Sequence, residues 1–213
     1  MTKEFLDNLQ DKLVYEDVEA KLFLTCSEAI PITHPAIFEL SILDKNESFS
    51  KSMNLSLSKA KLYSHQYEKF DYYCIIGNDG FPQQKDWLKK LVEGQKEKGC
   101  AIMCPNHDKP GLHMLKHHVI NQDDTYVQVR MFPAICWLIT SDVFFNIGYF
   151  DETFIPGCYE DDDYARRVRN DGGTIYVRKD VMITHRLSQT LGKMGAGEAM
   201  SKNLQRYREK WKE

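Results

Sequence analysis

Short apolar segments of strand length alternate with amphipathic helical patterns along most of this chain, and this alternation limits the folds open to it. The clearest segment is 71–76, Asp-Tyr-Tyr-Cys-Ile-Ile, a nearly continuous apolar run that is followed at once by Gly-Asn-Asp-Gly. Such a run suits a strand covered on both faces of its sheet. Because Asn-Asp-Gly is typical of a turn, the sequence predicts that this buried strand ends at residue 76.

The same patterns place the other elements. Apolar residues at helical spacing predict helices over 3–14, 48–62, 86–98, 143–147, 161–170 and 198–211. Short apolar runs predict strands over 21–26, 36–43, 100–104, 127–132, 134–140, 174–177 and 181–185. The polar, histidine-rich stretch 105–125 is interpreted as a loop. Strands that alternate with helices indicate an α/β fold with a mostly parallel central sheet flanked by helices.

Length and composition are those of one globular domain over residues 1–213, with 42% apolar and 28% charged residues. The net charge of −3 gives no general electrostatic attraction to nucleic acid, and the basic residues near the C-terminus are typical of a solvated helix face. No stretch approaches the about 20 apolar residues that span a bilayer, and the start resembles an amphipathic helix rather than a signal peptide. We expect a cytoplasmic protein, or one attached peripherally to a membrane, with reduced cysteines.

Asp79 comes immediately after the buried strand 71–76. In open α/β sheets, ligands bind beyond the carboxyl ends of the strands. A carboxylate held there can coordinate a divalent cation that also binds substrate phosphates. The alternative is a turn aspartate that satisfies nearby backbone groups, and the residue alone does not decide between them.

Four consecutive acids, Glu160-Asp-Asp-Asp163, follow Tyr159 at the start of a predicted helix. One or two acids there are explained by the positive end of the helix dipole. Four in a row exceed that need, because neighbouring like charges repel and raise one another's pKa. Such a cluster suits a general base beside a cation or a sugar hydroxyl, so capping and catalysis both stay open.

Histidines are the remaining candidates. His185 follows the predicted strand 181–185, where a lone histidine is more often structural than a ligand. His107, His113, His117 and His118 lie in the predicted loop, where their roles stay open; for His117-His118, a solvated loop outweighs contact with metal or acceptor.

The order of the motifs resembles the family 2 glycosyltransferases of the GT-A fold, across roughly residues 35–213. Segment 46–54 is similar to the family's N-x-G-F-x-x-x-x-N helix opening, and 73–82 followed by Trp87-Leu88 is similar to the strand with the D-x-D motif. Segments 133–139 and 147–152 resemble the acceptor side that ends in G-G-F-D-E. Segment 159–163 with Arg167 resembles E-D-x-D…R. His185, Ser188 and 207–211 resemble the closing H…S…Y-x-x-K-W.

This resemblance implies a GT-A-like domain with 1–76 as the nucleotide-binding half and 77–213 as the metal and acceptor half. It implies inverting transfer of a sugar from a nucleotide-sugar donor to an acceptor hydroxyl, with Mn2+ or Mg2+ on the donor phosphates. Asp161 would be the base, Asp79 the metal ligand and His185 a further ligand. The other positions divide into orienting residues (Glu160, Asp163), donor contacts (Glu28, Lys51, Asn54, Asn78 and Asp79 itself) and acceptor contacts (Cys136, Trp137, Tyr159, Arg167, the last also holding the acidic helix).

The chain departs from the family pattern in two places. Gly77 occupies the first acidic position of D-x-D. A metal would therefore be coordinated by Asp79 together with phosphate oxygens, water and His185, or the reaction would not require a metal. The family's opening strand is missing or is replaced by residues 1–20, which leaves Glu28 and Lys51 as the contacts expected for the nucleotide.

Two other classes of function compete with sugar transfer. A catalytically silent GT-A-like binding or assembly module is favoured by Gly77 and the short N-terminal part, and opposed by the intact acidic cluster and His185. A nucleotidyltransferase should carry a Gly-rich loop with Lys or Arg after its first strand, and none is evident. The acceptor stays open among a glycan, a lipid-linked sugar, a protein and a modified nucleobase, and the oligomeric state is undetermined.

Overall fold

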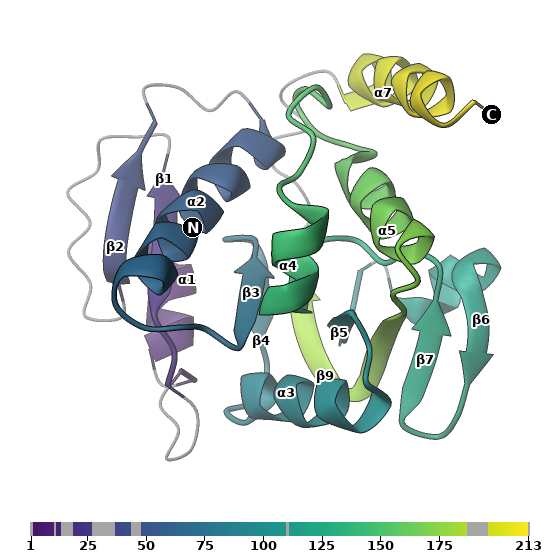
Figure 1. Cartoon of the computed structure of the whole chain (residues 1–213). Coiled ribbons are helices and arrows are strands. Elements are labelled where there is room, and N and C mark those ends of the chain that lie inside the picture. Colours follow the sequence, from purple (N-terminus) through teal and green to yellow (C-terminus); the bar gives the residue numbers. More distant parts are fainter. Residues whose placement is uncertain are drawn as a thin grey trace.

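The computed structural model describes residues 2–10, 12–13, 19–26, 37–43, 48–109, 111–186 and 196–212. Its helices are α1 (Thr2–Gln10), α2 (Phe49–Gln66), α3 (Trp87–Lys98), the 3-10 helix η1 (Leu112–His118), α4 (Ser141–Ile147), α5 (Glu160–Asn170) and α7 (Ala196–Trp211). Its strands are β1 (Leu22–Cys26), β2 (Ile37–Ile42), β3 (Tyr72–Ile76), β4 (Gly80–Pro82), β5 (Ile102–His107), β6 (Val119–Gln122), β7 (Tyr126–Val129), β8 (Cys136–Thr140) and β9 (Ile175–His185). Figure 1 shows their arrangement.

The main sheet has the order β3-β8-β5-β9-β7-β6, and β4 pairs with β9. Among the pairings described in this sheet, β5 and β9 run parallel, whereas β8 is antiparallel to both β3 and β5, and β7 is antiparallel to β6 and β9. The predicted α/β class is confirmed. The sheet is more mixed than the alternation of helices and strands indicates, because β8, β7 and β4 each run antiparallel to the strands they pair with.

Helices cover both faces of the main sheet (Figure 1). Helices α2, α4 and α5 pack in a core that contains Tyr164 and Trp137, whereas α1 and α3 pack in a second core that contains Leu91 and Leu138. Trp137 and Leu138 are consecutive residues of β8, so their side chains point to opposite faces. This covering on both sides explains why the central strands are apolar at nearly every position.

The N-terminal strands β1 and β2 pair in parallel as a separate two-stranded sheet. Helix α2 packs against β1, and the hydroxyl oxygens of Thr25 and Ser56 lie 2.6 Å apart. The ring of Phe23 in β1 contacts the ring of Phe70, just before β3, with centroids 6.2 Å apart. The small sheet is therefore tied to the main one through α2 and aromatic contacts.

Two local predictions differ from the structure because long-range pairing overrides the local pattern. The predicted strands 174–177 and 181–185 are one strand, β9, whose polar middle stays extended because Arg178 pairs with Tyr126 and the Lys179 N–H donates to the Thr125 carbonyl. The predicted loop 105–125 contains the end of β5, the helix η1 and the strand β6. None of the helices in the described part of the chain is both long and apolar enough to cross a membrane.

Candidate active site

The turn after β3 holds Asp79 at the edge of the sheet. The Gly77 N–H donates to the Ile135 carbonyl at 2.8 Å, and the Gly80 N–H donates back to the Gly77 carbonyl at 3.0 Å. Gly80 then pairs with His185 as β4 runs antiparallel to β9. These backbone bonds place Asp79 directly beside the carboxyl end of β9.

His185 faces Asp79 in an orientation fixed by backbone contacts. Its Nδ1 lies 2.7 Å from the Lys109 carbonyl oxygen, and its Nε2 lies 3.2 Å from Asp79 Oδ2. A carbonyl oxygen can only accept, so Nδ1 carries a hydrogen. Burial alone would lower the pKa of His185, but the hydrogen bond and the charge of Asp79 outweigh it, so that the pKa is raised.

The Asp79–His185 pair has the chemistry of a partial metal site. In the neutral ring both Nε2 and the facing carboxylate oxygen are acceptors, so a proton or a cation must lie between them. Carboxylate oxygen and imidazole nitrogen are both ligands of Mn2+, and Mg2+ sites commonly take one or two carboxylates with substrate phosphates. Within the described ranges, no three His, Cys, Asp or Glu side chains gather as a complete ligand set. The pair therefore fits a cation that is held jointly with donor oxygens.

Gly77, the departure from D-x-D, has a steric reason. A Cβ atom at this position would lie 2.7 Å from Asp79 Oδ1, closer than real Cβ contacts allow. A side chain at residue 77 would therefore displace the Asp79 carboxylate from its place opposite His185.

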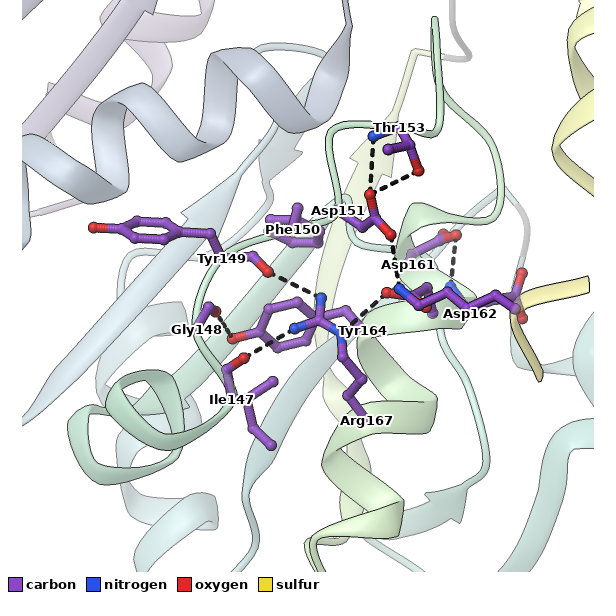
Figure 2. A network of polar contacts seen from close by, with 12 residues as sticks. Ile147, Gly148, Tyr149, Phe150, Asp151, Thr153, Asp161, Asp162, Tyr164 and Arg167 are labelled. Carbon is purple, nitrogen blue, oxygen red and sulfur yellow. Dashed lines mark hydrogen bonds and ion pairs between the residues drawn. The ribbon is translucent and has the colours of Figure 1, made fainter. Parts of the chain in front are cut away.

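The acidic helix places its first two acids in different surroundings. Glu160 is buried, and its Oε2 has no hydrogen-bond partner among the described residues. Burial, followed by the charge of Asp161, raises the pKa of Glu160 to about 8. Burial also raises the pKa of Asp161, although nearby backbone N–H groups lower it, first among them that of Asp162, which donates to Asp161 Oδ1 at 3.0 Å. Figure 2 shows the bond from Asp162.

The segment that leads into β8 connects this helix to the Asp79 turn. The Ala134 backbone N–H is among the groups that lower the pKa of Asp161, and the next residue, Ile135, accepts from the Gly77 N–H. Since β8 runs antiparallel to β3, its first residue, Cys136, pairs with Ile76 at the end of β3. The segment 134–136 thus pairs with the end of β3 beside Asp79, and its first residue has an electrostatic effect on Asp161.

Asp163 and Arg167 form a closed network instead of an open site. Asp163 is fully buried, and Arg167 Nε donates to its Oδ2 at 3.0 Å. Figure 2 shows the other guanidinium nitrogens of Arg167 donating to the Ile147 and Tyr149 carbonyls, each at 2.9 Å. Arg167 thus fastens α5 to the loop after α4.

Two predicted acceptor contacts lie in the core. Cys136 and Trp137 have no exposed surface, and the Trp137 indole N–H donates to the carbonyls of Phe132 and Pro133. A side chain without exposed surface cannot meet a ligand that arrives from solvent. Tyr159, by contrast, is half-buried at the start of α5, where its ring lies 5.7 Å from that of Tyr207.

The predicted donor contacts are dispersed. Asn54 is buried, and its Nδ2 donates to the Phe150 carbonyl and to Glu152 Oε1, while its Oδ1 accepts from the Phe150 N–H. These bonds connect α2 to the loop before α5. Lys51 lies half-buried in the first turn of α2, where its N–H donates to Ser48 Oγ. Asn78 is exposed in the Asp79 turn and donates to Thr2 Oγ1 at 3.3 Å. Glu28 and the motif residues Asn46 and Ser188 lie outside the described residues.

The prediction that His107 lies in a loop is wrong. It is the last residue of β5, is 1% exposed, and neither ring nitrogen has a hydrogen-bond partner among the described residues. Burial, with a smaller effect of the His185 charge, lowers the pKa of His107 to about 3. Its ring packs on Phe132, with centroids 4.6 Å apart. Its position beside β9 could have been found only from the strand pairing, because the local sequence is polar.

No family model and no curated protein matches the sequence. Among solved structures, the mannosyltransferase PcManGT from Pyrobaculum calidifontis in complex with GDP-Man and Mn2+ aligns with a TM-score of 0.65 at 13% identity, over 89% of this chain and 54% of that chain. GalNAc-T7 with UDP, GalNAc and Mn2+ aligns with a TM-score of 0.53 at 10% identity, over 69% of this chain and 32% of that chain. The chain spans about half the length of the first protein and about a third of the second. Its fold is that of the GT-A-type glycosyltransferases.

Proposed function

We propose that this chain is a glycosyltransferase that moves a sugar from a nucleotide-sugar donor to an acceptor hydroxyl by one inverting displacement. The observation that carries the proposal is the place of residues 134–136 between the two acidic stretches: Ile135 accepts from Gly77 and Cys136 pairs with Ile76 next to the Asp79 turn, and the Ala134 backbone N–H is among the groups that lower the pKa of Asp161. It supports an assignment of a candidate cation ligand, Asp79, and a candidate base, Asp161, to one edge of the sheet. The fold adds support, since similar folds occur in proteins solved with GDP-Man or UDP together with Mn2+.

In this proposal, Asp79 and His185 hold the cation side of the site. A bound Mn2+ or Mg2+ would neutralise charge on the leaving diphosphate. The contact of His185 Nδ1 with the Lys109 carbonyl directs Nε2 toward Asp79, so the pair is oriented before a ligand arrives. The nucleotide would contact the half of the domain that contains β1 and β2, where Lys51 is the candidate contact among the described residues.

On the acceptor side, Asp161 would take the proton from the attacking hydroxyl. Burial raises its pKa, which makes its carboxylate a stronger base than one in water, while the hydrogen bond from the Asp162 N–H orients it. Glu160, with a pKa of about 8, is protonated at neutral pH and can donate a hydrogen bond. Tyr159, half-buried beside them, is the candidate acceptor contact.

A silent binding module is the second candidate, because the described residues supply two metal ligands and no third. A panel of nucleotide sugars read by thermal shift, with and without Mn2+, tests both proposals. Mn2+-dependent stabilisation by one nucleotide class, followed by slow donor hydrolysis that is lost in Asp161→Asn, is expected of a transferase. Stabilisation with equal, negligible hydrolysis in both proteins would favour the module, and no stabilisation by any donor would contradict both.

A further inference from the structure

The C-terminal helix α7 reaches back to the acidic helix with a charged side chain. Lys210 Nζ lies 2.7 Å from Asp163 Oδ1 in α5 and 2.7 Å from Asp151 Oδ2 in the preceding loop. The indole N–H of the next residue, Trp211, donates to the same Asp163 oxygen at 3.1 Å. One ammonium group therefore bridges two carboxylates from segments that are separate in the chain.

A second contact from α7 fixes the loop between those segments. Asn203 is fully buried, and its Nδ2 donates to the carbonyls of Gly157 at 2.7 Å and Ile155 at 3.3 Å. One turn later, the Tyr207 ring lies against Tyr159. Figure 1 shows α7 beside the beginning of α5. Side chains from residues 203–211 of α7 thus contact segments within residues 151–163.

The backbone at the start of α5 explains why such support is needed. Cys158 and Tyr159 have φ angles of 75° and 71°, in the left-handed region that residues with a Cβ rarely adopt. Such residues persist where surrounding contacts determine their conformation. They directly precede Glu160 and Asp161, so the contacts that hold them also set where these two acids lie.

We propose that α7 is a positioning element for the acceptor side of the site, in which Lys210, Asn203 and Trp211 hold the loop 151–159 and thereby fix Asp161. None of the three touches the reacting atoms, and each acts through Asp163, Asp151 or the loop backbone. The catalytic part of this inference rests on the proposed transferase function, whereas its structural part does not.

Hydrogen exchange of the full chain tests the structural part without any substrate. Lys210→Met should speed amide exchange in peptides covering 153–162 by roughly 10-fold or more, while peptides of β3 and β5 keep their rates. Lys210→Arg, which can still bridge the two carboxylates, should restore most of the protection. Lys202→Met is the matched control, because Lys202 lies on the same helix and pairs only with Glu198 among the ion pairs described. Unchanged exchange in 153–162, or equal acceleration throughout the protein, would overturn the proposal.

Activity tests the catalytic part, using the donor that the thermal-shift panel identifies. Lys210→Met should lower kcat on the order of 10- to 100-fold with an unchanged donor KM, and Lys210→Arg should recover it. Asn203→Ala and Trp211→Phe serve the same purpose should Lys210→Met fail to fold. A parallel loss of donor affinity, or a normal kcat in a variant with a loosened loop, would contradict positioning. Loosened exchange in a protein that transfers no sugar would retain the structural role of α7 and contradict the proposed function alone.

Discussion

Two carboxylates that the sequence offers as candidates for the site, Asp163 and Asp79, have different surroundings in the structure. The Asp163 carboxylate accepts hydrogen bonds from Arg167 and Trp211 and forms an ion pair with Lys210. It has no exposed surface. Asp79 meets His185 in an arrangement that still requires a proton or a cation. The comparison teaches that a carboxylate with its partners complete stabilises the fold, whereas one with a partner missing is a candidate for chemistry.

Asp161 lies between these extremes, and its replacement should have the largest effect on activity. Asp161→Asn should lower sugar transfer by about 10³-fold, because the acceptor hydroxyl loses its base. Donor binding, measured by calorimetry with Mn2+, should stay near that of the unchanged protein. Asp162→Asn is the control on the same helix turn. Transfer at the original rate in Asp161→Asn would remove the base assignment.

Replacement of Asp163, whose partners are complete, should lower the stability of the fold. Asp163→Ala should lower the free energy of unfolding by about 2–3 kcal/mol, because it leaves Arg167 and Lys210 without their shared buried anion, although both keep some solvent. Urea denaturation measures this change, with Asp142→Ala on α4 as a control. A decrease in the free energy of unfolding of less than about 0.5 kcal/mol would mean that Asp163 does not stabilise the fold, and would contradict the proposed difference between Asp163 and Asp79.

Replacement of Asp79, which lacks a complete set of partners, should weaken donor binding and hardly change the stability of the fold. Asp79→Ala should weaken Mn2+-dependent donor binding by roughly 10- to 100-fold, since it removes one of two protein ligands. Calorimetry with and without Mn2+ gives the change, and Asp86→Ala at the start of α3 is the control. Equal donor affinity in Asp79→Ala and the control would show that the turn binds no cation.

The pH dependence of stability sharpens the comparison through Glu160. Because burial raises its pKa to about 8 from the ordinary 4.5, the folded protein binds a proton more tightly than the unfolded chain. The stability that Glu160 contributes is present below pH 4.5 and is lost as the pH rises toward 8. Glu160→Gln should therefore flatten this decline and raise the Tm by a few degrees at pH 8.5. An unchanged slope would mean that Glu160 titrates normally, and Glu93→Gln on the exposed side of α3 is the control.

Much of this could be predicted from the sequence, because strand ends and motif order are local signals. The α/β class follows from the alternation of strand and helix patterns, and the position of Asp79 after a buried strand follows from one apolar run and its turn. The acids at the start of α5 follow from consecutive residues. The assigned roles of Asp79, Asp161 and His185 stay predictions until they are tested.

What the sequence did not indicate depends on partners far along the chain. Asp163 is held by Lys210 and Trp211, and Asn54 by Phe150 and Glu152, so neither contact has a local signature. His107 stands in a polar stretch, and only its place beside β9 shows that it is buried. Long-range contacts of this kind decide which polar residues are left with an open partner.

Paramagnetic broadening by Mn2+ tests the central claim most directly. With a nucleoside diphosphate present, substoichiometric Mn2+ should broaden the backbone amide signals of Gly80, Ala134 and Asp161, and should leave those of the outward side of α7 sharp. Asp79→Ala should abolish the effect. Broadening around Gly80 with sharp signals at Ala134 and Asp161 would contradict a shared site, because the cation and the proposed base would then lie apart.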